Sequence, residues 1–150
     1  MISLQRLTLD LNVTPDTVVD PLDLMDDLTG GLSQLRSISF YVVVNSNAAQ
    51  LNEYLRGREQ QRNEKMIKYG QVYDVVHRLG PFGIHHCFTL PFQFAQIVQL
   101  GRQFPETRFQ NVVLLWVTNE GPFEYEFFVR LARCFPSLKS LHVSEDPTPE

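Results

Sequence analysis

Apolar residues recur in this chain as a short phrase, with apolar positions at the first, fourth and sixth places and variable residues between them. The first copy is Leu4, Leu7 and Leu9, followed by Asn12. Further copies are Leu35, Ile38 and Phe40, then Phe109, Val112 and Leu114, then Leu138, Leu141 and Val143, with a weaker copy at His85, Phe88 and Leu90. A phrase of this kind, repeated between helical segments, is typical of stacked strand–helix units. We therefore predict a parallel sheet within a solenoid.

The first part of the chain contains one complete unit of this pattern. Residues 4–12 alternate apolar and polar positions, as a half-buried strand does. Asp20-Pro21 predicts a helix start, because aspartate accepts from free amide groups and proline fits the first helical position. Gly30-Gly31 predicts the helix end. Residues 37–44 are rich in β-branched and aromatic side chains and predict a second strand.

Residues 47–80 depart from the pattern, and we interpret them as an irregular insertion. Asn47 predicts the cap of a helix that carries Leu51, Tyr54 and Leu55. Residues 56–65 have no apolar stripe, so they predict either a solvent-facing helix or a loose excursion. Residues 71–79 fit a strand and a helix equally well.

The second half of the chain alternates predicted strands and helices. Strands are expected at 84–90, at 112–117 and at 138–143, and the second of these is apolar enough for a central parallel strand. Helices are expected at 92–104 and 123–135, each ending at a Phe-Pro pair. The predicted repeat domain therefore spans 1–143, and 144–150 forms a tail.

Composition narrows the class of protein. Hydrophobic residues make up 43% of the chain, which is enough for a core, and the net charge of −4 disfavours binding of nucleic acid along a whole face. The longest apolar run, Val112–Val117, is far shorter than the roughly 18 residues that a membrane span needs. With two cysteines and no secretory leader, we expect a cytoplasmic or nuclear location. The first strand lacks a polar cap, so we expect a piece of a longer protein.

Three stretches resemble the leucine-rich-repeat region of F-box/leucine-rich-repeat proteins, in particular divergent invertebrate members. They are Leu4-Gln5-Arg6-Leu7-Thr8-Leu9, Leu35-Arg36-Ser37-Ile38-Ser39-Phe40 and the segment 126–143, which includes Phe135-Pro136-Ser137-Leu138. The resemblance implies a curved parallel sheet with helices on its convex face. It also implies that the repeats capture proteins for ubiquitination, while an F-box binds the ubiquitin-ligase adaptor.

The chain itself contains no F-box pattern, so adaptor binding is expected only if an F-box lies outside it. We therefore expect a non-catalytic protein-interaction module without a cofactor, acting as the substrate-recognition repeats of an F-box-type receptor. Two alternatives stay open at this point. One is a structural segment of a larger repeat protein, and the other is a cysteine-dependent enzyme.

The candidate binding surface is the outward face of the predicted strands. If Leu7/Leu9, Ile38/Phe40, Val112/Leu114 and Leu141/Val143 point to the core, the residues between them share one concave surface. An apolar centre within a polar rim is a plausible arrangement for binding a protein. The alternative is that residues 47–80 or flanking repeats cover this surface. The candidate partner-binding residues are Tyr41, Val113 and Leu115 at the centre, with Arg6, Asp10 and His142 around them.

Residue types that could carry chemistry occur without a supporting motif. In His85-His86-Cys87 the neighbouring side chains would point to opposite faces of a strand, and no second pair has ligand spacing, so we expect no metal site. Cys87 or Cys134 could pair with His77 or His142 as a nucleophile, but no local motif indicates this.

Two charged stretches have simple structural interpretations. The four aspartates between residues 20 and 27 lie where a helix start favours negative charge, and they lack the spacing of a calcium loop. Basic residues between 56 and 68 are interleaved with glutamates, which predicts a solvated polar face.

Overall fold

The computed structural model describes residues 4–146, which form seven strands and four helices. The elements of the first half are β1 (Arg6–Val13), α1 (Pro21–Thr29), β2 (Ser37–Asn47), α2 (Ala48–Leu55), α3 (Glu59–Ile67), β3 (Val72–Leu79) and β4 (Phe82–Thr89). Those of the second half are β5 (Gln96–Leu100), β6 (Leu114–Glu120), α4 (Tyr125–Cys134) and β7 (Ser140–Asp146).

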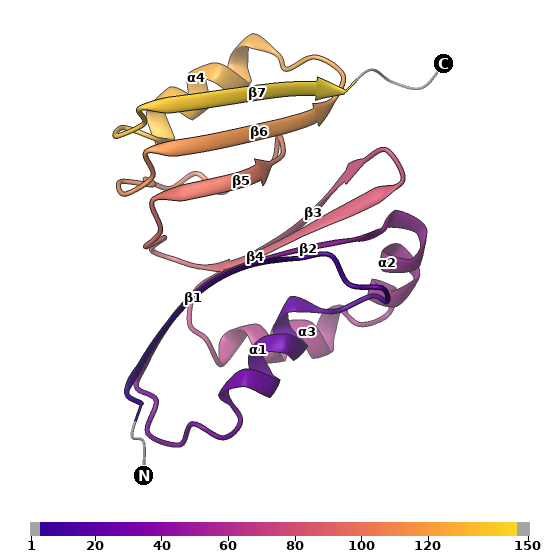
Figure 1. Cartoon of the computed structure of the whole chain (residues 1–150), viewed down its shortest axis with the longest axis vertical. Coiled ribbons are helices and arrows are strands. Elements are labelled where there is room, and N and C mark those ends of the chain that lie inside the picture. Colours follow the sequence, from indigo (N-terminus) through magenta and orange to yellow (C-terminus); the bar gives the residue numbers. More distant parts are fainter. Residues whose placement is uncertain (1–3, 147–150) are drawn as a thin grey trace.

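The strands form two separate sheets, so the predicted leucine-rich-repeat solenoid is wrong. The four-stranded sheet has the order β1-β2-β4-β3, and the three-stranded sheet has the order β5-β6-β7 (Figure 1). β1 and β2 are parallel, but β4 is antiparallel to both β2 and β3. The β3–β4 hairpin thus replaces the next parallel unit of a solenoid, and the stack of strand–helix units is interrupted there. Only the three strands of the second sheet continue a parallel arrangement.

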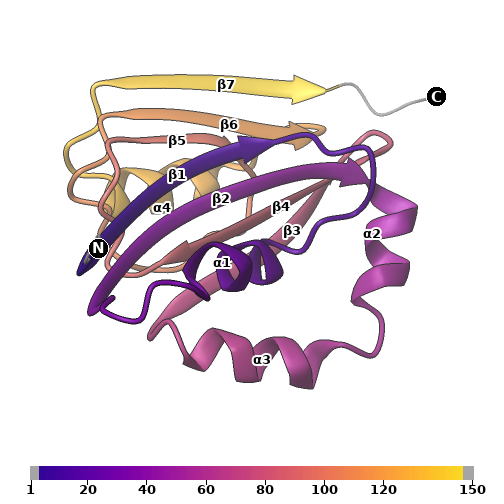
Figure 2. The same cartoon turned by 60° about the horizontal axis from the view of Figure 1, so that its bottom comes forward.

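The central strands of the four-stranded sheet, β2 and β4, are buried on both faces. Phe40, Val42 and Val44 of β2 pack with Leu22 and Met25 of α1 in one apolar cluster. α1 lies against this face, as Figure 2 shows. Tyr41 and Val43 alternate with these residues on β2 and point to the opposite face. They belong to a second apolar cluster, which is formed by both sheets and α4. This arrangement explains why β2 contains five consecutive buried residues.

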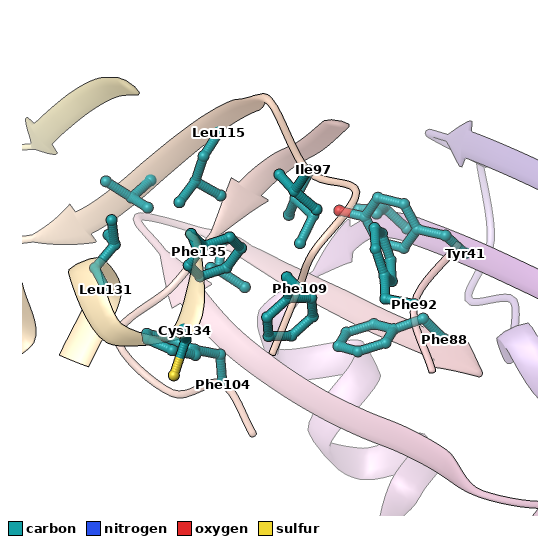
Figure 3. Close-up of a cluster of buried hydrophobic side chains, with 14 of the residues drawn as sticks. Tyr41, Phe88, Phe92, Ile97, Phe104, Phe109, Leu115, Leu131, Cys134 and Phe135 are labelled. Carbon is teal, nitrogen blue, oxygen red and sulfur yellow. The ribbon is translucent and has the colours of Figure 1, made fainter. Parts of the chain in front are cut away.

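The cluster between the sheets is rich in phenylalanine. Phe88 of β4, Phe92 and Phe109 contact one another edge to face, with ring centroids 5.3–6.2 Å apart. Phe109 also stacks on Phe135, just after α4, at 4.6 Å. Figure 3 shows these rings between the strands of both sheets and α4. Aromatic side chains thus connect the two halves of the chain through large buried surfaces.

Several local predictions are confirmed. Asp20 caps α1 by accepting a hydrogen bond from the Leu22 amide at 2.9 Å, and Pro21 occupies the first helical position. Asn47 caps α2 in the same way, accepting from the Gln50 amide at 3.0 Å. Within residues 71–79 the strand alternative is correct, because Val72–Leu79 form β3. The predicted tail begins too early, because β7 extends to Asp146, and residues 147–150 lie outside the described part.

The predicted helix at 92–104 is wrong, because this segment contains β5. Ile97 and Leu100 are buried in the cluster between the sheets, and β5 pairs with β6. The spacing of apolar residues in this segment fits a helix, but pairing with a neighbouring strand overrides such a local preference. The pairing is irregular between Ile97 and Leu100, and Gln99 has a positive φ of 59°.

Candidate functional site

Two of the three central residues of the predicted binding surface, Tyr41 and Leu115, are buried. Tyr41 and Leu115 are 1% and 0% exposed and lie in the cluster between the sheets (Figure 3). The Tyr41 hydroxyl donates a hydrogen bond to the Val98 carbonyl at 2.9 Å, and burial raises the pKa of this hydroxyl above its ordinary value. The prediction that Tyr41 and Leu115 face outward is therefore wrong.

A register error explains the wrong assignment of Leu115. The repeated phrase equates Leu114 with Val143, whereas the structure pairs Leu115 with Leu141 and Val117 with Val143. Because side chains alternate along a strand, an odd shift moves every residue to the opposite face. Leu115 and Val117 therefore face the core on β6, whereas the phrase predicted that Val112 and Leu114 would be the core-facing residues of this strand.

The other predicted residues are dispersed. Arg6 and Asp10 are exposed on β1, and partial burial raises the pKa of the Asp10 carboxyl above its ordinary value. Val113 is half-buried before β6, where its carbonyl accepts from the amides of Lys139 and Ser140. His142 is exposed on β7. Of the six predicted residues, only His142 belongs to the surface described next.

The most exposed apolar strand edge of the described residues is β7. It lies at one end of the three-stranded sheet (Figure 1), and no described strand pairs with its other side. Leu141 and Val143 are 39% and 44% exposed, although they occupy the same face as the buried Leu115 and Val117. The outermost strands β1, β3 and β5 differ, because their apolar residues are buried or half-buried.

The helix above the sheet extends this apolar edge. α4 buries Phe127, Leu131 and Cys134. Arg130 lies on the flank toward β5, because its guanidinium donates to the Phe104 carbonyl at 2.9 Å and covers the Phe104 ring. With 3.6 residues per turn, Phe128 falls on the opposite flank, toward β7. Phe128 is 37% exposed, so the apolar edge continues from the sheet to the helix.

The opposite face of the sheet contributes an exposed aromatic pair. Trp116 of β6 and His142 of β7 are register partners, and their rings stack with centroids 4.1 Å apart and planes 14° apart. Trp116 is 44% exposed. Parallel sheets are usually covered on both faces, so an exposed tryptophan here is uncommon. We call Phe128, Leu141, Val143, Trp116 and His142 together the β7 edge surface.

The backbone of β7 supplies hydrogen-bonding groups at this edge. The Ser140 amide donates to the Val113 carbonyl at 3.0 Å, so the peptide groups of Ser140 point toward β6. In a parallel ladder the residues bonded to one neighbour alternate with those directed away from it. His142 therefore points its peptide groups toward β6, and Leu141 and Val143 point theirs toward the open side. Peptide groups at such an edge are a template for another strand.

A second candidate site is the network of buried charges around Arg62. Burial would lower the pKa of Arg62, but the carboxylates of Asp74 and Asp20 raise it. Burial would likewise raise the pKa of Asp74, but hydrogen bonds from His85 and Arg62 hold it well below its ordinary value. His85 Nε2 lies 2.7 Å from Asp74 Oδ1.

A cavity of about 510 Å³ borders this network, with Arg62 and Asp74 in its wall. Charged groups beside a cavity are a common sign of an active site. Here, however, both oxygens of Asp74 and both oxygens of Asp20 accept hydrogen bonds within the protein. Each of these carboxylate oxygens is thus already used within the protein, and the network attaches α3 to α1 and β3.

The cysteine and histidine candidates are buried. Cys87 is 0% exposed, and burial raises the pKa of its thiol well above the ordinary value, which disfavours the reactive thiolate. His86 is also buried, and it stacks on His77 with ring centroids 5.1 Å apart. Cys134 is 4% exposed. Within residues 4–146, no group of three or more His, Cys, Asp or Glu residues could hold a metal ion.

Comparisons with known proteins add no assignment. No helix in the described part of the chain is long and apolar enough to cross a membrane. No protein-family model, no curated protein and no solved structure matches the chain.

Proposed function

We propose that this chain is a non-catalytic protein-interaction module that binds an extended protein segment by adding it as a strand to β7. The observation that supports this most directly is the exposure of Leu141 and Val143, although their register partners on β6, Leu115 and Val117, are buried. A strand placed beside β7 gains backbone hydrogen bonds, and its side chains cover these two residues. Phe128 on the α4 side of the sheet and Trp116 on the opposite side add further apolar surface that the bound strand can contact.

The proposal is narrower than the expectation from sequence. Because the described residues form two sheets and no solenoid, it does not include the ubiquitin-ligase role that the resemblance implied. The cysteine-dependent alternative gains no support, since both cysteines are buried. Strand addition depends on the β7 edge surface alone, so it can be tested without knowing a natural partner.

A library of short displayed peptides, selected on the whole chain, tests the proposal. We expect the enriched peptides to alternate apolar and polar residues, because such a peptide can cover Leu141 and Val143 with one of its faces. Binding is then measured with synthetic peptides through the emission of Trp116, the single tryptophan of the chain. Emission should change on binding, since Trp116 stacks on the strand that accepts the peptide.

Val143→Lys is the variant that blocks the site, because it places a charge where the added strand must pack. Ile67→Lys is the matched control, since Ile67 is a highly exposed apolar residue on α3. We expect selected peptides to bind the control as they bind the unmodified chain, and to bind Val143→Lys at least about tenfold more weakly. Equal binding to both variants, or no enrichment of alternating peptides, would contradict the proposal.

A further inference from the structure

We propose that the β7 edge surface binds the same surface of a second copy of the chain, through an antiparallel β7–β7 pair centred on His142. This inference rests on the proposed function and names the partner. It follows from the directions of the backbone groups, from the order of side chains along β7 and from the position of α4. Two-fold dimers are the commonest closed assemblies, and they require a surface that is complementary to itself.

The backbone of β7 fits this register. In the centred pair, Leu141 of one copy lies opposite Val143 of the other, and the symmetry repeats the arrangement. The peptide groups of both residues point to the open side, as the Ser140–Val113 hydrogen bond requires. Each Leu141–Val143 pair can therefore exchange two N–H···O bonds, and His142 becomes a pair without hydrogen bonds at the centre.

The side chains along β7 match in the same register. On the α4 face, Leu141 packs beside Val143, so the two exposed apolar residues of each copy cover each other. On the opposite face, Ser140 lies level with Ser144, and the two His142 residues lie side by side. Apolar pairs across antiparallel strands stabilise the pairing.

Neighbouring registers fit less well. Moving the centre to Val143 separates Leu141 from the Val143 of the other copy, so the pair of exposed apolar residues is lost. A second alternative pairs Leu141 with the His142 of the other copy. The peptide groups of Leu141 point to the open side, but those of His142 already point toward β6, so the two residues cannot exchange hydrogen bonds. This register also brings residues of opposite faces together. Of these registers, the one centred on His142 both allows the backbone hydrogen bonds and pairs Leu141 with Val143.

The helices extend the interface. A two-fold axis perpendicular to the sheet keeps both α4 helices on one face, so their β7-side flanks approach each other above the new strand pair. Phe128, exposed on that flank, then lies over the row formed by Leu141 and Val143. The two three-stranded sheets become one continuous sheet, and two exposed edges are removed.

Sedimentation equilibrium of the whole chain tests the assembly. We expect twice the monomer mass at high concentration, and a dissociation constant that rises at least about tenfold in Val143→Lys, because each interface then buries two unpaired charges. Ile67→Lys should dimerise as the unmodified chain does. Far-ultraviolet circular dichroism establishes that both variants are folded. A chain that stays monomeric at every concentration, or equal dimerisation of all three proteins, overturns the inference.

Disulfide trapping tests the register. In a pair without hydrogen bonds, opposed Cβ atoms are about 4.5–5.5 Å apart, close to the separation that a disulfide needs. His142→Cys should therefore form an intermolecular disulfide under mild oxidation by oxidised glutathione. Ser144→Cys is the control, because its two copies would lie about 13 Å apart. Preferential cross-linking through Val143→Cys would overturn the register centred on His142.

The two proposals can fail separately. A monomeric chain that still binds alternating peptides at β7 retains the proposed function and loses the self-association. A chain that neither dimerises nor binds such peptides loses both. A dimer that dissociates when an alternating peptide is added agrees with both, because the peptide and the second copy then compete for one edge.

Discussion

Arg62 and Asp20, 42 residues apart in the sequence, form a buried two-point ion pair. The Nε–Oδ2 distance is 2.8 Å and the Nη2–Oδ1 distance is 3.1 Å. The same guanidinium also contacts Asp74 on β3, so one side chain joins α1, α3 and the four-stranded sheet. Arg62 is the only buried residue of α3, a helix with almost no apolar surface. A charge network thus attaches a helix that hydrophobic packing alone would leave loose.

Replacing Arg62 should destabilise the protein strongly. Arg62→Ala leaves Asp20 and Asp74 as buried carboxylates without their partner, and removal of one member of a buried pair costs about 3–5 kcal/mol. Arg62→Lys should recover only part of this loss, because an ammonium group cannot make the two-point contact. The free energy of unfolding in urea measures the effect. The exposed Arg56→Ala should change it by less than about 0.5 kcal/mol, and a similar loss in both variants would contradict the assignment.

Stability should fall as the pH is lowered from about 6.5 to 4. Burial lowers the pKa of His86 to about 3, with His77 adding to the shift and the Gln99 backbone opposing it, and burial lowers the pKa of His77 to about 4. In this interval the unfolded chain binds protons at these histidines and the folded chain does not. Unfolding is therefore favoured by up to about 1.4 kcal/mol per pH unit for each histidine.

His86→Phe separates this effect from other titrations. The variant keeps an aromatic ring beside His77 and Tyr41 but removes one titrating group, so the slope of unfolding free energy against pH should be smaller above pH 4. The slope is the readout, because the larger ring also changes the absolute stability. Asp74 contributes separately, and only below its ordinary pKa of 3.8, since its folded pKa is lowered. An unchanged slope in His86→Phe would count against the buried neutral state of His86.

The contact between Gly101 and His77 should not tolerate a side chain. A Cβ atom added at Gly101 would lie 2.8 Å from His77 Cγ, where β3 meets the segment after β5. We expect Gly101→Ala to cost about 1–3 kcal/mol through this overlap. Gly31→Ala is the matched control, because a Cβ atom there meets nothing within 4 Å. Thermal unfolding of both variants measures the difference, and equal melting temperatures would disprove the close contact.

The stacking of His142 on Trp116 should affect the fluorescence of Trp116 but contribute little to the stability of the fold. Because both rings are exposed, His142→Ala should change the emission of Trp116 and alter the unfolding free energy by less than about 1 kcal/mol. Intrinsic fluorescence and urea unfolding of the same samples measure the two effects. A large loss of stability would instead assign the pair a structural role.

Local signals determined much of the secondary structure. The Asp20-Pro21 start of α1, the Asn47 cap of α2 and the apolar stripe of α4 depend on residues close together in the sequence, so the sequence was sufficient to predict them. Parallel pairing of β1 with β2 also followed from the first two copies of the phrase, since Leu7 lies beside Ile38 as the phrase requires.

Long-range pairing determined what the pattern could not. The phrase identified strands but not their partners, so the antiparallel β3–β4 hairpin replaced the expected solenoid unit. The phrase also placed β6 in the wrong register against β7, and a single odd shift exchanged the buried and exposed faces. Arg62 gave no apolar signal in the sequence, because its role depends on carboxylates that only the folded chain brings near it.

The sequence by itself determined where most strands and helices form, because caps and periodicity act over a few residues. Only the tertiary structure decided which faces are buried. Tyr41 and Leu115 became core residues because two sheets pack together, while Leu141 and Val143 stayed exposed because β7 is the last described strand of its sheet. Burial is a property of the neighbours that a strand acquires, and those neighbours are distant in the sequence.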